Sequence, residues 1–391
     1  MSFVPMDSVG ERGGLKLNET RTVEEVYNGY TYFEDGDVVI AKITPCFENG
    51  KGALARELTN GVAFGTTELH VVRPGTEIDG RFLFYLTIAD DFRSFGEAEM
   101  LGAGGQKRIP EDFVKDWRAP LPPFETQRRI ADFLDEKTAR INSLIEKKHA
   151  LLERLAEKRQ ALLTRAVTKG LSSTARMKNS GIDWLGEIPD HWIVKPIYSF
   201  QRRITYGFTN PMPTTDDGPF MLTANDIDYG SIRYETARRT DQEAFDDDIT
   251  DKSRPQLGDI LITKDGTLGR VAVFDGQLAC INQSVALLRV QDKLVDPDFL
   301  AFCLLSQPYQ EEMILNAGGT TIKHIYITRL TKMPVAMPSI SEQLEIRDYC
   351  RHISETISRV ERRIQSSIER LSEYRSSIVI SAVSGRIRRL L

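Results

Sequence analysis

The sequence lacks the features that mark several large classes of protein. No apolar run approaches the roughly 18 residues that a membrane-spanning helix needs, and the N-terminal stretch MSFVPMDSVG has neither the basic nor the apolar region of a signal peptide. The four cysteines stand far apart, without a CxxC pair or a histidine at ligand spacing. Disulfides and a zinc site are therefore not expected, and the absences together indicate a cytoplasmic protein without a membrane anchor.

Sequence motifs of catalysis are also missing. There is no GxxxxGK[ST] nucleotide loop, no glycine-rich S-adenosylmethionine loop and no nuclease-type cluster of carboxylates and lysine. Asn210-Pro211-Met212-Pro213 matches the tetrapeptide of DNA methyltransferases only superficially, and the five histidines are dispersed. No catalytic residue, metal or cofactor is expected, so the sequence favours a binding protein over an enzyme.

A long helical segment, from Gln127 to Gly170, is present instead, without proline or internal glycine. Its apolar spacing predicts a narrow seam for pairing with another helix, at Ile141, Leu144, Leu151, Leu155, Leu162 and Ala166. The pattern returns within Glu342–Leu391, with a seam at Ile357, Val360, Ile364, Ile368, Leu371, Tyr374, Ile378 and Ala382. Because the first helix has Lys148 and Lys158 where the second has apolar residues, we expect the two helices to pair with each other, antiparallel, within one chain.

The segments before the two helices match each other as well. Gly36–Lys42 (GDVVIAK) corresponds to Gly258–Lys264 (GDILITK), and Leu121–Gln127 corresponds to Met337–Gln343. In each half, short β-type runs bounded by turn dipeptides alternate with helical patches. The sequence therefore predicts an α+β fold in which a globular domain followed by a long helix occurs twice.

Domain boundaries follow from this repeat. We expect a first globule at 1–124, its helix at 125–170, a polar linker at 171–181, a second globule at 182–340 and its helix at 341–391. The expected strands include Asp37–Ile43, Leu69–Val72, Asp259–Thr263, Arg270–Phe274 and Ser284–Val290, and the expected shorter helices are Gly80–Ala89 and Pro297–Ser306. Residues 182–219 have no counterpart in the first half, so the first globule is expected to lack its N-terminal opening.

Charge is uneven along the chain. The two long helices are net basic, whereas the remainder is acidic enough to bring the whole chain to −5. This distribution fits DNA contact on chosen faces, and it fits ordinary solvated helix surfaces equally.

Several segments together resemble the specificity subunit of type I restriction–modification systems. They are Phe33–Leu69, Leu121–Ile130, Trp184–Trp192 and the two equal helices, and the resemblance covers essentially the whole chain. It implies two target-recognition domains, an antiparallel coiled coil that spaces them and no catalysis by the chain itself. Each domain would read one half of a split double-stranded DNA site containing a methylated adenine. The partners implied are two DNA-methyltransferase (modification) subunits and motor-nuclease (restriction) subunits.

The repeat supports the same mechanism independently. Two similar but non-identical globules suit half-sites of different sequence, about one helical turn or ~34 Å apart. Two alternatives remain open at this point. One is the specificity module of a related system whose methyltransferase and nuclease share one polypeptide, and the other is a coiled-coil adaptor without a DNA role.

The residues expected to contact DNA are basic, amide, hydroxyl or aromatic side chains at strand ends and in loops. Lys42 and Lys264 end the matched strands. Two glycine turns can present backbone N–H groups and cations to phosphate, namely Gly104, Gly105, Gln106, Lys107 and Arg108, and Gly319, Thr320, Thr321, Lys323 and His324. Loop side chains suited to reading bases in the major groove are Tyr206, Phe208, Thr209, Asn210, Thr223, Asn225, Asn282, Gln283 and Ser284, and Lys51 and Thr267 complete the set. The same residue types are common in ordinary turns, which is the alternative for each of them.

Overall fold

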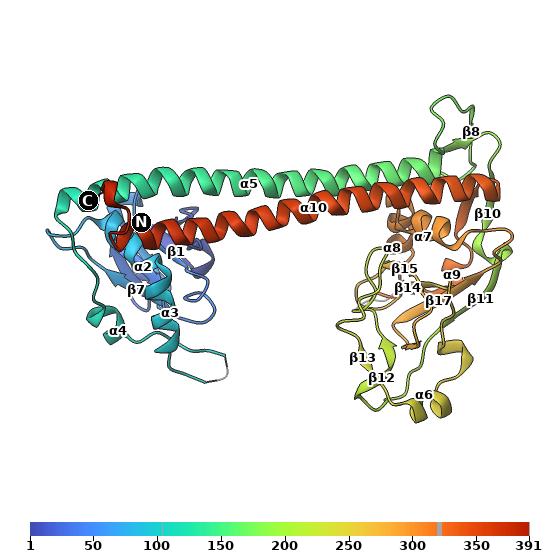
Figure 1. The fold of residues 1–391 in the computed structure, drawn as a ribbon, viewed down its shortest axis with the longest axis horizontal. Helices are drawn as coiled ribbons and strands as arrows, with labels where there is room; N and C mark the ends of the chain where they lie inside the picture. Colours follow the sequence, from blue (N-terminus) through green and yellow to red (C-terminus); the bar gives the residue numbers. More distant parts are fainter. Residues whose placement is uncertain (104, 319–322, 391) are drawn as a thin grey trace. The chain divides into compact units, whose positions relative to one another are not determined.

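The computed structural model describes residues 1–103, 105–318 and 323–390, and the chain divides into two units. Unit 1 comprises Met1–Ala150 and Arg363–Leu391, and unit 2 comprises Leu151–Arg362. Each unit contains one globule and stretches of both long helices, α5 (Phe124–Lys169) and α10 (Ile340–Val383) (Figure 1). The predicted α+β class, with a long helix after each of two globules, is confirmed.

Unit 1 contains two small sheets. One is antiparallel with the order β5-β4-β7, and the other has the order β2-β1-β6-β3, in which β1 runs parallel to β6. The strands are β1 (Ser2–Val4), β2 (Glu19–Thr20), β3 (Thr31–Glu34), β4 (Val38–Ala41), β5 (Gly52–Leu54), β6 (Val62–Gly65) and β7 (Leu69–Val72). The shorter helices are α1 (Val23–Val26), α2 (Gly80–Ile88), α3 (Asp90–Ala98) and α4 (Glu111–Asp116).

Unit 2 repeats this plan and adds to it. Its sheets have the orders β11-β17-β14-β15 and β13-β12-β16, with β12 parallel to β16, and two strand pairs, β10-β18 and β8-β9, complete the unit. The strands are β8 (Met177–Asn179), β9 (Glu187–Pro189), β10 (Ile193–Pro196), β11 (Gln201–Tyr206), β12 (Thr215–Leu222), β13 (Arg238–Arg239), β14 (Ile260–Thr263), β15 (Val271–Val273), β16 (Ala279–Ile281), β17 (Val285–Val290) and β18 (Pro334–Met337). The helices are α6 (Gln242–Asp248), α7 (Pro297–Leu305), α8 (Gln307–Leu315) and α9 (Ile327–Leu330).

The added strands come from the segment without a sequence counterpart. In unit 2, β11 covers the outer edge of β17 and β10 pairs with β18. In the described part of unit 1, β7 pairs with β4 alone, so its other edge carries no strand. The expected linker at 171–181 is partly ordered as a strand, because β8 pairs with β9 through main-chain hydrogen bonds.

The central strands β4 and β14 form where the repeated motif places four apolar or small residues in a row. All four residues of each strand are buried, as expected for a strand covered on both faces. The aspartate before each strand is also buried and holds an arginine: Asp37 bonds Arg73 at 2.7 and 2.8 Å, and Asp259 bonds Arg289 at 2.7 and 2.6 Å. The repeated Gly-Asp motif therefore serves the fold in both units.

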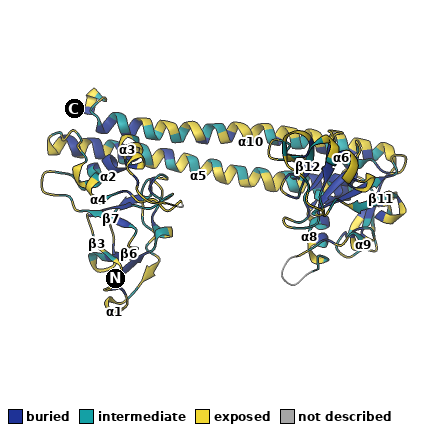
Figure 2. Cartoon of the chain, turned by 90° about the horizontal axis from the view of Figure 1, so that it is seen from below, coloured by how far each residue is buried: buried dark blue, intermediate teal, exposed yellow. Residues whose placement is uncertain are grey.

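Each globule shares an apolar cluster with the long helices, through α2 in unit 1 and through α7 and α8 in unit 2. In unit 1, Phe82 and Leu86 of α2 share an apolar cluster with Ile130 and Leu134 of α5 and with Ile378 and Ala382 of α10. Since Asn142 of α5 also bonds Arg375 of α10 at 2.5 Å, residue numbers rise along one helix as they fall along the other. The two helices are thus antiparallel within unit 1, and Figure 2 shows buried, intermediate and exposed residues interspersed along both of them.

The expected seam is wrong at four positions. Leu144 and Leu151 of α5 are 42% and 46% exposed, and Val360 and Tyr374 of α10 are 39% and 55% exposed. The other apolar seam positions of α10 include four buried isoleucines and a buried alanine, Ile357, Ile364, Ile368, Ile378 and Ala382.

In α10, two polar pairs explain why Val360 and Tyr374 lie outside the seam. A strict alternation of four and three residues places Arg375 in the seam instead of Tyr374, and Glu361 instead of Val360. In unit 1 Arg375 bonds Asn142, and in unit 2 Glu361 pairs with Arg159 of α5. The sequence analysis assigned the apolar neighbours Val360 and Tyr374 to the seam, because sequence spacing does not show that a charged seam residue has a partner.

Candidate nucleic-acid interface

Loops from separate stretches of sequence meet at one end of the β11-β17-β14-β15 sheet in unit 2. Lys264, directly after β14, donates its backbone N–H to the carbonyl of Ser284 (2.9 Å), and its carbonyl accepts the N–H of Ile325 (2.9 Å). The Ser284 hydroxyl accepts the N–H of Ala224 at 2.9 Å. Three loops are therefore tied to Lys264 by hydrogen bonds.

A fourth loop joins them after β11. The N–H of Phe208 donates to the carbonyl of Ile281 (3.0 Å), and the Phe208 carbonyl accepts the N–H of Gln283 (2.8 Å). The structure thus brings together candidates that are widely separated in sequence, namely Tyr206, Phe208, Thr209, Asn210, Thr223, Asn225, Lys264, Thr267, Asn282, Gln283, Ser284, Lys323 and His324.

The same backbone arrangement occurs in unit 1. Lys42 donates its N–H to the Glu68 carbonyl (3.0 Å) and accepts the N–H of Ile109 (2.9 Å). Leu101 and Arg108 then exchange two backbone hydrogen bonds of 2.9 and 2.8 Å, as Gly318 and His324 do in unit 2 at 2.9 and 2.7 Å. Lys42 and Lys264 are therefore structural equivalents, whereas Glu68 and Arg108 occupy the places of Ser284 and His324.

The basic side chains of this end of unit 2 surround one carboxylate. The ammonium of Lys264 lies 2.6 Å from Asp265, and Nδ1 of His324 bonds the other carboxylate oxygen. Burial raises the pKa of Asp265, but the hydrogen bonds from Lys264 and His324 outweigh burial and hold the pKa below its ordinary value. The ionised Asp265 therefore positions the Lys264 ammonium and the His324 ring, and the Lys264 ammonium also lies 5.4 Å from the ring centre of Tyr206.

Arg108 of unit 1 is held in a comparable way. Its guanidinium makes two parallel hydrogen bonds to Glu68, of 2.9 and 2.8 Å, and these bonds lower the pKa of Glu68. Lys107 is bound through its backbone to Thr44, which leaves its side chain exposed beside the exposed Gln106. Gly105 has a φ of 77°, the left-handed conformation that favours glycine.

Some of the predicted DNA-contacting side chains are engaged in hydrogen bonds that stabilise their own loops. Lys51 donates its ammonium to the Met6 carbonyl at 3.0 Å. The amide oxygen of Asn282 accepts the N–H and the hydroxyl of Ser284 at 3.0 and 2.6 Å, and the Thr223 hydroxyl donates to Asp226 at 2.7 Å. Other candidates leave their side chains exposed, namely Thr209, Asn210, Asn225, Thr267, Gln283 and Lys323.

Gly104, Gly319, Thr320 and Thr321, which complete the two predicted glycine turns, lie outside the described residues.

Sequence reasoning missed the acidic members of these clusters. Glu68 and Asp265 each hold a candidate cation, Arg108 and His324, across 40 and 59 positions of sequence. Lys252 was also missed, and its ammonium lies 5.9 Å from the ring centre of Tyr206. No sequence spacing signals such pairs, although Asp265 stands directly beside Lys264 and could have suggested a local ion pair.

Other chemistry finds little support in the described parts of the chain. No three His, Cys, Asp or Glu side chains gather there as metal ligands would. Burial raises the pKa of the Cys280 and Cys350 thiols to about 12, so neither is a reactive thiolate at neutral pH. No described helix is long and apolar enough to cross a membrane.

Comparison with known proteins agrees with the repeated fold. A family model, the type I restriction modification DNA specificity domain, matches residues 9–154 and 214–370, which is more than half of the chain. A chain from a structural study of complex assembly and conformational transition of the type I R-M system superposes with a TM-score of 0.76 at 18% identity, over 98% of this chain and 91% of that one.

Curated relatives are similar in sequence. The EcoEI specificity subunit of Escherichia coli is 43% identical over 132 residues, 33% of this chain and 22% of the relative. The EcoBI specificity subunit of the same species is 26% identical over 295 residues, 72% of this chain and 60% of the relative. The matched segments therefore span less than two thirds of either relative. Together with the family model over both halves, they show that the chain belongs to the family of type I restriction–modification specificity (S) subunits.

Proposed function

We propose that this chain is the DNA-reading subunit of a type I restriction–modification complex and that it recognises an asymmetric, two-part site in double-stranded DNA. The repeated backbone arrangement around Lys42 and Lys264 carries the proposal. In both units it presents a lysine at the end of a buried strand, beside loops whose side chains differ. A constant frame with variable side chains suits two domains that bind different sequences.

The proposed DNA contacts are of two kinds, contacts to phosphates and contacts to base edges. Lys42, Lys107, Lys264 and Lys323 supply positive charge for phosphates, and the hydrogen-bonding side chains of Asn210 and Gln283 suit base edges. Asp265 and Glu68 hold His324 and Arg108 in place before DNA arrives. Preorganised charge of this kind reduces the ordering cost of binding.

The long helices would set the distance between the two half-sites. α5 has 46 residues and α10 has 44, which at ~1.5 Å per residue corresponds to about 65–70 Å of helix. Removing a whole turn from both helices should shorten the gap and leave the half-sites unchanged.

Partner subunits would supply the catalysis. We propose methyltransferase subunits, two per chain, and motor-nuclease subunits, acting together in the cytoplasm. Apolar side chains are exposed on the long helices in each unit, Leu144 in unit 1 and Leu151 and Val360 in unit 2, and this exposure supports docking of other proteins. The presence of two similar units supports the proposed number of two methyltransferase subunits.

Methylome sequencing tests the proposal most directly. Cells without endogenous methylation would express the chain together with its methyltransferase partner. Methylated adenines should appear in a two-part motif with a fixed gap, and substitutions in unit 1 or unit 2 should change only one half of it. A continuous single-part motif, or the same motif without this chain, would contradict the proposal.

A further inference from the structure

Unit 1 contains an open pocket between α3 and α4 that the DNA-reading proposal does not use. Its volume is about 550 Å³, and its floor is formed by Phe95, Leu101, Phe113 and Trp117. Phe95 is 62% exposed and Leu101 is 70% exposed. Large apolar side chains gathered in one hollow of a surface are typical of a binding site, because their exposure to water is unfavourable.

The aromatic rings form one connected group. The ring centre of Trp117 lies 5.9 Å from that of Phe95, 5.5 Å from that of Phe113 and 5.3 Å from that of the buried Phe92. Contact with Phe92 and with the apolar cluster beneath it holds Phe113 and Trp117 in place. Phe113 and Trp117 are therefore anchored on the core of unit 1, and Phe95 lies beside Trp117 with most of its side chain exposed.

The rim of the pocket is acidic. Glu99, Asp112 and Asp116 line it and are exposed. Lys115 pairs with Glu111 at 2.7 Å, and within the described part of unit 1 no ion pair engages the three rim carboxylates. Such a rim repels phosphate and attracts cations, so this face is unsuited to DNA and suited to a basic ligand.

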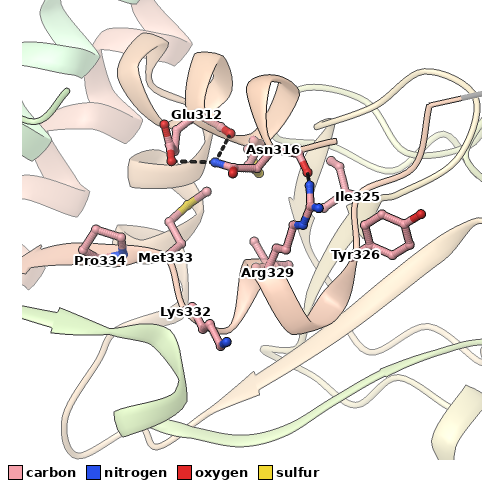
Figure 3. A pocket seen from close by; sticks show the side chains of 10 residues that line it. Glu312, Asn316, Ile325, Tyr326, Arg329, Lys332, Met333 and Pro334 are labelled. Atoms are coloured by element: carbon pink, nitrogen blue, oxygen red, sulfur yellow. Dashed lines mark hydrogen bonds between the residues drawn. The ribbon is translucent and has the colours of Figure 1, made fainter. Parts of the chain in front are cut away.

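Unit 2 has a pocket at the equivalent place with different chemistry. It lies between α8 and α9, has a volume of about 240 Å³ and is lined by Glu312, Asn316, Tyr326, Arg329, Lys332 and Met333 among others (Figure 3). Figure 3 shows Arg329 bonded to the backbone oxygen of Asn316, while Lys332 extends apart from that pair.

The two pockets correspond in the repeat. In each unit, the residues that line the pocket include those directly after the isoleucine that donates its N–H to the equivalent lysine, Ile109 to Lys42 and Ile325 to Lys264. At matching positions unit 1 has Phe113, Asp116 and Trp117 where unit 2 has Arg329, Lys332 and Met333. The fold therefore requires neither the aromatic floor nor the acidic rim, and these features are particular to unit 1.

We propose that the α3–α4 pocket of unit 1 binds a basic segment of a partner protein. An arginine or lysine of the partner lies over the rings of Phe95, Phe113 and Trp117, its charge is matched by the rim carboxylates, and apolar flanking residues cover Leu101. The pocket in unit 2 carries cations at two of the matching positions, so the same segment does not bind there. One partner segment is bound per chain, and the docking distinguishes the two halves of a pseudo-symmetric molecule. This inference stands independently of DNA reading.

The test uses the full chain and a fluorescein-labelled synthetic peptide of alternating arginine and leucine, with a glutamate–leucine peptide as its counterpart. Fluorescence anisotropy at physiological salt should show saturable binding of the basic peptide only. Asp116→Lys, which installs the residue of unit 2, and Phe95→Ser, at an exposed position, should each weaken binding about tenfold or more. Both side chains lie at the surface, and circular dichroism will verify that the variants are folded.

Matched controls separate the pocket from general charge. Glu24→Lys on α1 makes the same change in net charge outside the pocket, and Lys332→Asp alters only the pocket of unit 2. Both should leave the affinity for the basic peptide within twofold of the parent chain. Equal weakening by Glu24→Lys and Asp116→Lys, full binding by the Phe95→Ser variant, or no saturable binding would overturn the proposal. Sedimentation that shows a dimer abolished by Asp116→Lys would identify a second copy as the occupant and overturn it as well.

Discussion

Gln127 and Gln343 make the same three hydrogen bonds in the two units. The amide oxygen of Gln127 accepts the N–H of Asp79 (2.8 Å), and its amide nitrogen donates to the carbonyls of Glu77 (2.9 Å) and Pro122 (2.8 Å). Gln343 does the same with Asp296 (2.9 Å), Leu294 and Pro338 (both 3.1 Å). Both side chains are buried at the start of a long helix, where they join that helix to the segment that begins α2 or α7.

Replacing either glutamine by alanine should destabilise the packing of the globule against its long helix. Gln127→Ala or Gln343→Ala removes the partner of three backbone groups that are mostly half-buried, and we expect a loss of about 2–3 kcal/mol in the free energy of unfolding of the affected unit. Urea denaturation followed by circular dichroism measures it. Gln365→Ala, at an exposed position of α10, is the control and should change stability by less than about 0.5 kcal/mol. A loss no greater than that of the control would show that the three bonds are dispensable.

Asp37 should make the stability of unit 1 depend on pH in the acidic range. Burial raises its pKa, but the hydrogen bonds from Arg73 and from the Glu34 N–H outweigh burial, and the folded-state pKa lies below the ordinary value. A depressed pKa contributes stability that is present above the unfolded-state pKa of about 4 and is lost as pH falls through the folded-state value. Asp37→Asn should therefore destabilise the chain by about 2 kcal/mol at pH 7 and by progressively less below pH ~4. A difference that does not change with pH would contradict this assignment.

Arg159 and Glu361 should specify how the helices pair within unit 2. The side chains are 30% and 25% exposed and are ion-paired in the seam. Reversing either charge alone places like charges together and should lower the urea midpoint, whereas Arg159→Glu with Glu361→Arg should recover most of the loss. We expect a coupling free energy of about 1 kcal/mol from the double-mutant cycle. Additive effects of the two substitutions would mean that the pair does not contribute.

Lys264 should contribute to DNA affinity through its charge. In the reconstituted complex, Lys264→Ala should weaken binding several-fold and reduce the dependence of log affinity on log salt by about one, as expected when one phosphate contact is lost. Lys332→Ala, at an exposed lysine of unit 2 outside the proposed interface, serves as the control and should leave the salt dependence unchanged. An altered target sequence with an unaltered salt slope would instead place Lys264 against a base.

Replacing Asp265 should have the opposite effect on non-specific DNA affinity from replacing Lys264. It holds Lys264 and His324 but also brings negative charge to the proposed interface. Asp265→Asn removes that charge and weakens the anchor of the Lys264 and His324 side chains, so affinity for unrelated DNA should rise several-fold while discrimination between target and non-target sequences falls. Filter binding with specific and non-specific duplexes measures both quantities. Reduced affinity for both duplexes would show that Asp265 is needed mainly for folding.

Local sequence patterns determined a large part of this architecture. The runs of apolar or small residues after Gly36-Asp37 and Gly258-Asp259 became β4 and β14, and the expected strand at Leu69–Val72 is β7 with the same bounds. The two long helices follow from segments without interior proline or glycine, and the repeat predicted that the globule would occur twice. Such features depend on neighbouring residues, so they can be recognised in one sequence.

Tertiary structure alone decided the features that depend on distant residues. Whether Tyr374 or Arg375 lies in the helix seam depends on Asn142, which accepts a hydrogen bond from the arginine. The pairing of Arg108 with Glu68, the convergence of four loops around Lys264 and the aromatic pocket at Trp117 likewise join segments that sequence spacing does not connect. The physical reason is that a buried polar side chain is stable only with a partner, and the partner is chosen by the fold.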